Sequence, residues 1–299
     1  MTIQPMSPLM EPEEQEVRSV EHIELSLLLE GLYQLCEYDF RQYVRTSLRR
    51  RVLNRMKAEG LTTITALLNK VLHDSACLTR LLNDMSIRVT EMFRDPDFFA
   101  VFRSKVIPEL RAYPEIRIWH AGCATGEEAY SMAIMMLEEG LAEKTRIYAT
   151  DMNEKALEAA RRGAFPLKQM QIYTRNYQES GGTKSFSEYY TTDSQYAYLD
   201  EEVKKSLIFA QHNLVTDGSF NEFHVILCRN VLIYFDHELQ QHVHRLLYNS
   251  LSKRGFLGLG NKESIFNSMD RQLYEEFAPR EKIYRKAAEA IGTSGMFQR

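Results

Sequence analysis

A cluster of small residues, AGCATGEEAYS, has the residue types best suited to binding a ligand. It follows EIRIWHA, which predicts a strand, and it opens GEEAYSMAIMMLEEGL, which predicts a helix. Gly122 and Gly126 would let the backbone approach a bound molecule closely. Glu127 and Glu128 place two acids in the first turn of that helix, where they also favour the helix dipole. The stretch therefore predicts a ligand-binding turn of acidic character.

Two phosphate-binding motifs do not fit this turn. A P-loop requires GxxxxGK[ST], and no Lys-Ser or Lys-Thr follows the glycines. A dinucleotide fingerprint requires GxGxxG and places a pyrophosphate at the helix N-terminus, where Glu127 and Glu128 would repel it. The turn fits a nucleoside without phosphates better, and it would tolerate a positive charge.

A third acid stands at the end of the next predicted strand. TRIYATD ends at Asp151, about 25 residues after Gly126. In doubly wound sheets an acid at this place accepts hydrogen bonds from ribose hydroxyls. The alternative role of Asp151 is to cap the helix that starts near Asn153. The small turn, the acidic helix start and Asp151 together indicate S-adenosylmethionine, which carries an adenosine, no phosphate and a positive sulfonium.

The predicted elements would hold these residues at one edge of a sheet. From Glu115 strands and helices alternate, which predicts an α/β fold with a doubly wound, Rossmann-like, mainly parallel sheet. Such sheets bind ligands at the carboxyl ends of their strands. From about Glu21 to Ile87 the sequence is helical, with no Pro and little Gly, which predicts an all-α N-terminal domain.

Composition shifts along the chain predict its domain boundaries. Proline and glutamate dominate the N-terminus, three prolines follow the helical region, and a tyrosine-rich stretch around Gly181-Gly182 interrupts the α/β pattern. The predicted parts are a flexible tail over 1–18, a helical domain over 19–90, a linker over 91–114, an α/β domain over 115–290 with an inserted β-subdomain over 166–204, and a tail over 291–299.

Bulk composition excludes several classes of protein. The net charge of −4 argues against a general nucleic-acid binder. The four cysteines form no CxxC pair and the histidines show no ligand spacing, so we expect neither a metal nor disulfides. No secretory signal or membrane-spanning run is visible, so we expect a cytoplasmic protein, and a monomer is our default.

Three segments taken in order resemble the CheR-type chemotaxis receptor methyltransferases: VTEMFRDPDFF, AGCATGEEAYS and FHVILCRNVLIYFD. YDFRQYVRTSLRRRVLNRM resembles that family's arginine-rich N-terminal helix, and the resemblance runs from about residue 35 to 287. It implies S-adenosylmethionine-dependent methylation of glutamate side-chain carboxylates on the cytoplasmic helical bundle of a receptor. It also implies a helical N-terminal domain, a doubly wound C-terminal domain and a small inserted β-subdomain.

The resemblance also implies which residues form the site. Arg94 and Tyr234 would flank the transferring methyl group. From the residues alone, Arg94 could equally pair with Asp95 or Asp97, and Tyr234 could be a core tyrosine. The residues that would line the cofactor pocket are Thr90, Arg94, Ala121, Glu127, Asp151, Asn213, Leu214, Arg229 and Asn230.

The chain departs from the family pattern at three places. Ala129 replaces a usual Pro after the glutamate pair, which removes some rigidity but no ligand group. Arg88 stands where the family commonly has Asn, two residues before the Thr, so we assign no cofactor contact to Arg88. The insertion is a few residues shorter than in members that dock a receptor's C-terminal peptide, which puts such tethering in doubt.

A basic segment is the predicted partner surface. Arg41, Arg45 and Arg49 recur every four residues and would form one helix stripe that attracts an acidic receptor helix. A solvated face and a local nucleic-acid surface are the alternatives.

Two further functions stay open: a non-catalytic regulator that keeps the cofactor pocket, and a methyltransferase of another substrate. CRNVLIY lacks the prolines of the [DN]PP[YF] motif, which favours an oxygen acceptor over a base amino group.

Overall fold

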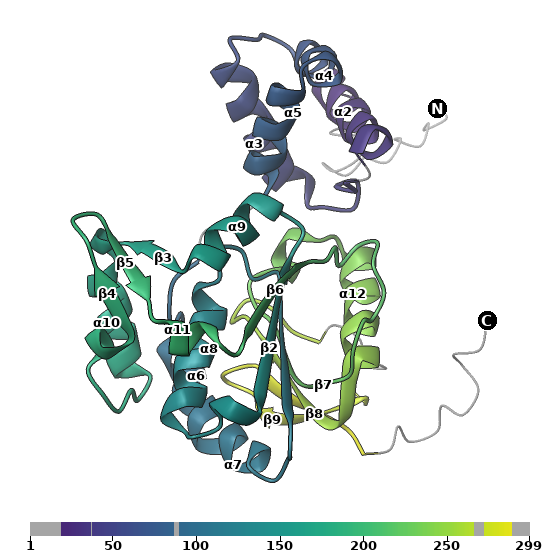
Figure 1. The fold of residues 1–299 in the computed structure, drawn as a ribbon. Coiled ribbons are helices and arrows are strands. Elements are labelled where there is room, and N and C mark those ends of the chain that lie inside the picture. The colour runs from purple at the N-terminus through teal and green to yellow at the C-terminus, as the bar shows by residue number, and fades with distance from the viewer. Residues whose placement is uncertain (1–18, 37, 87–89, 266–271, 289–299) are drawn as a thin grey trace, which may run out of the picture. The chain divides into compact units, whose positions relative to one another are not determined.

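The computed structural model describes residues 19–36, 38–86, 90–265 and 272–288 (Figure 1). The chain divides into two compact units, Met1–Ser86 and Ile87–Arg299. The tails predicted over 1–18 and 291–299 lie outside the described residues, and so does Arg88. Within the described ranges, every helix is too short or too polar to cross a lipid bilayer.

The first unit is helical, with bounds that follow local capping signals. Gly60, at a positive φ, comes just after one helix, and the Thr63 side chain accepts the N–H of Ala66 to begin the next. Asp74 caps the following helix through the N–H groups of Ala76 and Cys77. The helices are α2 (Val20–Cys36), α3 (Arg45–Ala58), α4 (Ile64–His73) and α5 (Ser75–Met85).

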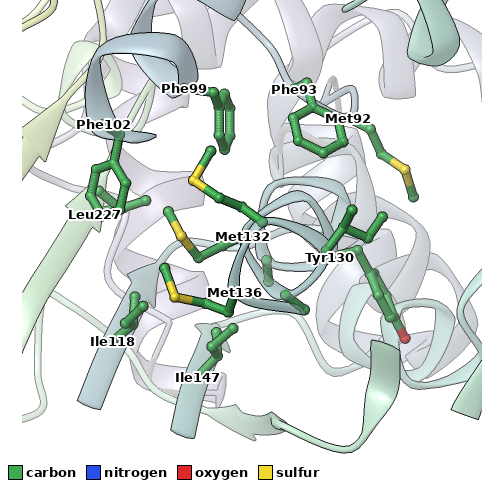
Figure 2. Packing of buried hydrophobic residues seen from close by; sticks show 14 of the residues in the cluster. Met92, Phe93, Phe99, Phe102, Ile118, Tyr130, Met132, Met136, Ile147 and Leu227 are labelled. Carbon is green, nitrogen blue, oxygen red and sulfur yellow. The ribbon is translucent and has the colours of Figure 1, made fainter. Parts of the chain in front are cut away.

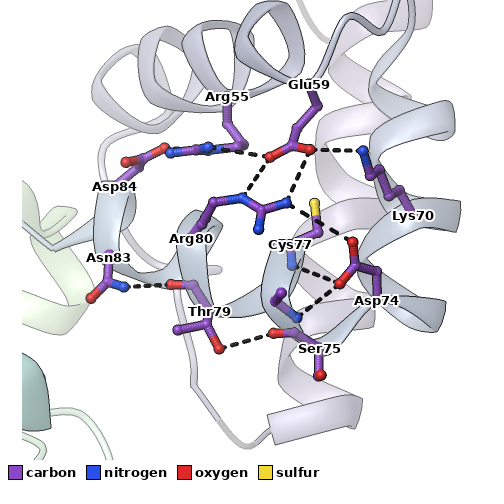
Figure 3. Close-up of polar contacts among 11 residues, drawn as sticks. Arg55, Glu59, Lys70, Asp74, Ser75, Cys77, Thr79, Arg80, Asn83 and Asp84 are labelled. Atoms are coloured by element: carbon purple, nitrogen blue, oxygen red, sulfur yellow. Dashed lines mark hydrogen bonds and ion pairs between the residues drawn. The ribbon is translucent and has the colours of Figure 1, made fainter.

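Ion pairs around Glu59 join three of these helices (Figure 3). The Glu59 carboxylate accepts hydrogen bonds from Arg55, Arg80 and Lys70, at 3.2 Å, 2.8 Å and 2.7 Å. Arg80 and then Lys70 lower the pKa of Glu59 to about 2. Because these bases come from α3, α5 and α4, the network fixes the three helices relative to one another.

The predicted arginine stripe is divided between a turn and a helix. Arg41 precedes α3, which begins at Arg45, so the stripe on α3 is limited to Arg45 and Arg49. Asp39 accepts both the backbone N–H and the guanidinium of Arg41, which stabilises a turn rather than a helix there.

The second unit is built on a seven-stranded sheet with the order β6-β2-β1-β7-β8-β10-β9 (Figure 1). Its first five strands are parallel, and β10 runs antiparallel to both of its neighbours. This arrangement confirms the doubly wound fold class predicted from the sequence. The strands are β1 (Ile116–Ala121), β2 (Thr145–Asp151), β6 (Leu207–Gln211), β7 (Phe223–Cys228), β8 (Leu251–Leu259), β9 (Tyr274–Ala278) and β10 (Ile283–Lys286).

Helix α8 (Glu127–Glu138) forms the centre of the core (Figure 2). Met132 and Met136 lie over Ile118 of β1 and Ile147 of β2, and all four side chains are buried. A central parallel strand is covered on both faces, which explains why every residue of β1 except Arg117 is buried. Helix α9 (Glu154–Arg162) follows β2, and helix α12 (His237–Ser250) connects β7 to β8.

Of residues 91–114, predicted as a linker, 96–110 are helical in the structure. They contain α6 (Pro96–Val101), a π-helical segment η1 (Phe102–Val106) and α7 (Ile107–Leu110), and their apolar side chains belong to the core of the second unit. Pro96 and Pro108 stand in the first turns of α6 and α7, where the missing N–H costs nothing. The prolines therefore begin helices here instead of separating domains.

The interruption of the α/β pattern folds as a helix and a small sheet. Strands β3 (Ala164–Pro166), β5 (Tyr196–Leu199) and β4 (Tyr190–Thr192) pair antiparallel in that order. Helix α10 (Leu167–Glu179) was not expected, and Gly181 and Gly182 follow just after its end. A Cβ at Gly182 would lie 2.2 Å from the buried ring of Tyr177, so this glycine makes room for the aromatic packing of the insertion.

Candidate active site

The turn after β1 has the backbone geometry that its glycines predict. Gly122, Ala124 and Gly126 all have positive φ angles. The N–H groups of Gly122 and Cys123 both donate to the carbonyl of Thr150 at 2.8 Å, which fastens the turn to β2. A Cβ at Gly122 would lie 2.6 Å from a methyl of Val231, so this position accepts only glycine without rearrangement.

Asp151 closes onto this turn. Its Oδ2 accepts the N–H of Ala124 and its Oδ1 accepts the N–H of Asn153, both at 2.9 Å. The cap of α9 is Asn153 itself, whose side chain accepts the N–H of Ala156. Asp151 therefore binds the backbone of the turn and the backbone just before α9. These two hydrogen bonds hold its carboxylate at the carboxyl end of β2.

The two glutamates at the start of α8 differ in surroundings. Glu127 is 5% exposed and accepts the hydroxyl of Thr125 at 2.7 Å. Burial raises the pKa of Glu127 to about 7, although Thr125 and Tyr173 of the insertion helix oppose the shift. A buried acid with a raised pKa is favourably placed to bind a cation, because a positive ligand would stabilise its ionised form.

Glu128 belongs to a buried charge network instead. It contacts Nδ1 of His120 at 3.0 Å and Nη1 of Arg229 at 2.7 Å. Burial alone would raise the pKa of Glu128, but the charge of Arg229 and the hydrogen bond to His120 lower it to about 2. Glu128 is therefore an ionised partner that holds Arg229.

Arg229 uses its side chain to support the segment that carries Arg94. Its fully buried guanidinium donates to Asp95 at 2.8 Å and to the carbonyl of Arg94 at 3.3 Å and 3.4 Å, and it lies 4.0 Å from the centre of the Phe98 ring. Asp95, which the sequence offered as a partner for Arg94, is thus paired with Arg229. A buried ion pair of this kind fixes geometry more than it adds stability.

Arg94 stands between two residues of unusual backbone conformation. Phe93 and Asp95 have φ angles of 51° and 56°, which is rare for a bulky residue such as Phe. The N–H of Phe93 donates to the Ser131 hydroxyl at 2.8 Å, and its ring is buried against Phe99. Strain of this kind persists only where the surroundings enforce it, and it often marks functional segments.

The loop after β7 carries Asn230 and Tyr234. Asn230 has a φ of 60°, and Leu232–Tyr234 form a single 3-10 turn. The backbone of this loop is held by Glu263, a buried acid that sequence reasoning missed. Its only signal in the sequence was an acid following the apolar strand FLGLG.

Parallel pairing brings the predicted residues to one edge of the sheet. Ala121 ends β1 and Asp151 ends β2, while Asn213 and Leu214 follow β6 and Asn230 follows β7. Leu214 is 7% exposed, and the Asn213 side chain accepts the N–H of Val215 at 3.0 Å. Thr90 begins the described part of this unit and is partly exposed.

Comparison with known proteins identifies the family. Residues 88–280 match the CheR methyltransferase, SAM binding domain, and residues 23–86 match the CheR methyltransferase, all-alpha domain. The chain belongs to the CheR methyltransferase family. It is an S-adenosylmethionine-dependent chemotaxis protein methyltransferase, as the resemblance implied.

Two relatives show how far the likeness extends. A Pseudomonas putida protein named as methyltransferase Cher3 is 44% identical over 265 residues, which cover 89% of this chain and 97% of the relative. A Listeria innocua chemotaxis protein methyltransferase is 31% identical over 234 residues, covering 78% of this chain and 86% of the relative. The turn, Asp151 and the acidic start of α8 fit S-adenosylmethionine, the ligand that the matching domain binds.

Proposed function

We propose that this chain transfers a methyl group from S-adenosylmethionine to glutamate side chains of methyl-accepting chemotaxis receptors, which gives glutamyl methyl esters. The match to both CheR domains carries this proposal. We further propose that the protein acts in the cytoplasm, at the receptor arrays of the membrane.

The site would bind the cofactor through the turn, Asp151 and Glu127. Asp151 would accept hydrogen bonds from the ribose hydroxyls, and Glu127 would face a positively charged part of the molecule. Thr90, Ala121, Asn213, Leu214 and Asn230 would line the same pocket. The side chain of Arg229 would support this pocket from within, because its guanidinium is paired with Asp95 and Glu128.

Bound S-adenosylmethionine supplies a methyl group on a positive sulfonium, ready for in-line displacement. The receptor glutamate is ionised at neutral pH, so the protein needs no general base. Arg94 would orient the incoming carboxylate through a partial contact, since a tight ion pair would reduce its nucleophilicity. Tyr234 would direct its hydroxyl toward the same carboxylate and its ring toward the sulfonium. Alignment by these two residues would lower the barrier by several kcal/mol, on the order of what positioning supplies in other enzymes.

The first unit would provide the receptor surface. Helix α3 contains Arg45, Arg49 and Arg50 and no acid, and it would attract an acidic receptor helix. Arg49 pairs with Glu21, and Arg41 pairs with Glu30 and Asp39, within the same unit. A receptor carboxylate would therefore exchange places with these internal acids, which favours a weak and reversible contact.

Methylation of receptor membranes tests the proposed function. The protein is incubated with S-adenosylmethionine labelled in its methyl group, together with membranes containing one receptor. We expect base-labile label on the receptor, and none on a matched receptor whose substrate glutamates are replaced by alanine. Absence of label on every receptor tried would support a non-catalytic regulator, and label on RNA or on a small molecule would indicate another substrate.

A further inference from the structure

Glu263 receives an unusual number of backbone hydrogen bonds. Its Oε2 accepts the N–H of Gly260 at 2.6 Å and of Asn230 at 2.9 Å. Its Oε1 accepts the N–H of Val231 at 2.8 Å and of Ile233 at 3.3 Å. Three of these donors lie in the loop after β7, so one side chain from the turn that follows β8 fixes the loop that carries Tyr234.

The carboxylate is isolated from solvent. Glu263 is 2% exposed, and burial raises its pKa while the four N–H groups oppose that shift. Burying a carboxylate is costly unless hydrogen bonds compensate it, and buried N–H groups are equally costly without acceptors. The Glu263 carboxylate therefore needs the N–H groups of the loop as donors, and those N–H groups need the carboxylate as their acceptor.

The fit between the two segments is close. A Cβ at Gly260 would lie 2.7 Å from Oε2 of Glu263 and 2.8 Å from the backbone nitrogen of Asn230. Asn230 itself has a φ of 60°, a left-handed conformation that the loop must hold. Glycine at 260 leaves room for the Glu263 carboxylate and the Asn230 backbone to lie side by side.

We propose that Glu263 is a positioning residue for methyl transfer. It holds residues 230–234 so that the Tyr234 hydroxyl meets the reacting carboxylate and Asn230 meets the cofactor. This inference rests on the proposed roles of Asn230 and Tyr234. Glu263 touches neither substrate; it acts through the backbone of the loop.

The test compares Glu263→Gln with a matched control, Glu138→Gln. Glutamine would direct an amide NH₂ at two N–H groups and displace part of the loop. Glu138 has a fully buried side chain that pairs with Arg103 of η1. It also accepts the N–H of Thr183 and the hydroxyls of Tyr177 and Tyr189 in the insertion. We expect kcat to fall about tenfold or more in E263Q, with receptor KM changed less than about threefold. E138Q should keep kcat within about threefold while its melting temperature falls.

A double-mutant cycle with Tyr234→Phe tests the route of the effect. If Glu263 acts through Tyr234, E263Q should lower kcat by less than about threefold once Tyr234 is already Phe. Fully multiplicative losses would overturn the proposal, and so would a kcat near wild type in folded E263Q. If E263Q does not fold, Gly260→Ala disturbs the same contact from the other side and should give the same loss of kcat.

The affinity for S-adenosylhomocysteine, measured by calorimetry, separates this inference from the proposed function. If the wild-type protein methylates no receptor, the proposed function fails, but the affinity still reports on the loop. Binding weakened about threefold or more in E263Q and unchanged in E138Q would then support the positioning role of Glu263. Unchanged binding in both variants would overturn it.

Discussion

Glu127 and Glu128 are neighbours in the sequence, yet the fold gives their carboxylates opposite tendencies. Burial raises the pKa of Glu127 to about 7, whereas Arg229 and His120 outweigh burial and lower that of Glu128 to about 2. Successive residues of a helix point about 100° apart, so one faces the candidate pocket and the other faces the ion pairs. Two adjacent glutamates thus have different roles: Glu127 belongs to the candidate pocket and Glu128 to the ion pair with Arg229.

Replacing Glu127 by Gln should make stability less dependent on pH. Because the pKa of Glu127 in the fold is above its ordinary value of 4.5, its contribution to stability is complete below pH 4.5 and is lost as pH rises through about 7. Glutamine mimics the protonated acid. The melting temperature of E127Q should therefore exceed that of the wild type by several degrees at pH 8 and match it at pH 4.5, in thermal scans.

The same substitution should weaken S-adenosylmethionine binding about tenfold or more at pH 8, since it removes a negative charge from the pocket. Calorimetric titration at pH 8 and pH 5.5 would measure this. Equal affinity of E127Q and wild type at pH 8 would remove Glu127 from the cofactor site.

Arg94→Ala should lower kcat about 100-fold while the affinity for S-adenosylhomocysteine changes less than about fivefold. The reason is that Arg94 is assigned to the incoming carboxylate, and its segment is held independently by Arg229 and Ser131. Turnover on receptor membranes and calorimetry give the two quantities. An unchanged kcat would remove this role, and a large loss of affinity would show that Arg94 acts mainly through its predicted place in the cofactor pocket.

At the scale of elements, the turn between β1 and α8 combines two requirements. It must adopt left-handed conformations at Gly122 and Gly126, and it must lie against the loop after β7 through Val231. Only the first requirement can be read from the sequence, because the second joins segments about 100 residues apart.

Comparing Gly122→Ala with Gly140→Ala should separate these requirements. Both glycines have positive φ, but a Cβ at Gly140 meets nothing within 4 Å, whereas one at Gly122 meets Val231 at 2.6 Å. G140A should cost about 1 kcal/mol of stability from backbone strain alone. G122A should cost about 1–3 kcal/mol more through overpacking and weaken S-adenosylhomocysteine about tenfold. Similar values for both variants in denaturant titration and calorimetry would contradict this account.

At the scale of the whole molecule, charge is distributed unevenly. The chain carries a net charge of −4, while α3 contains six basic residues and no acid. Attraction of an acidic receptor must then come from a local field, which salt screens over about 10 Å at 0.1 M ionic strength. Receptor binding should depend on ionic strength much more than cofactor binding does.

Charge reversal on α3 tests this. Arg45→Glu combined with Arg49→Glu should raise receptor KM about tenfold or more and leave the affinity for S-adenosylhomocysteine unchanged. Arg245→Glu, an exposed reversal on α12 of the second unit, is the matched control and should leave receptor KM within about twofold. An equal rise in both variants would indicate non-specific repulsion, and lost cofactor affinity would indicate misfolding.

Much of the fold could be predicted from local patterns. The alternation of strands and helices from Glu115 and the Gly-rich turn predicted the doubly wound sheet, because periodicity and backbone conformation are local properties. The segment containing Pro96 and Pro108 was misjudged as a linker, because proline at the first turn of a helix and proline in a linker look alike without their tertiary contacts. Helix α10 was missed for a similar reason, since its tyrosines serve as core residues only when packed against the sheet.

The sequence by itself determined most elements of the α/β alternation from Glu115, the small-residue turn and the acids at strand ends, because these depend on residues within a few positions of one another. Tertiary structure alone decided that Arg229 supports Arg94 and that Glu263 holds the loop of Tyr234. Those contacts join residues about 135 and 30 positions apart, and nothing in the local sequence encodes which partner a buried charge will meet.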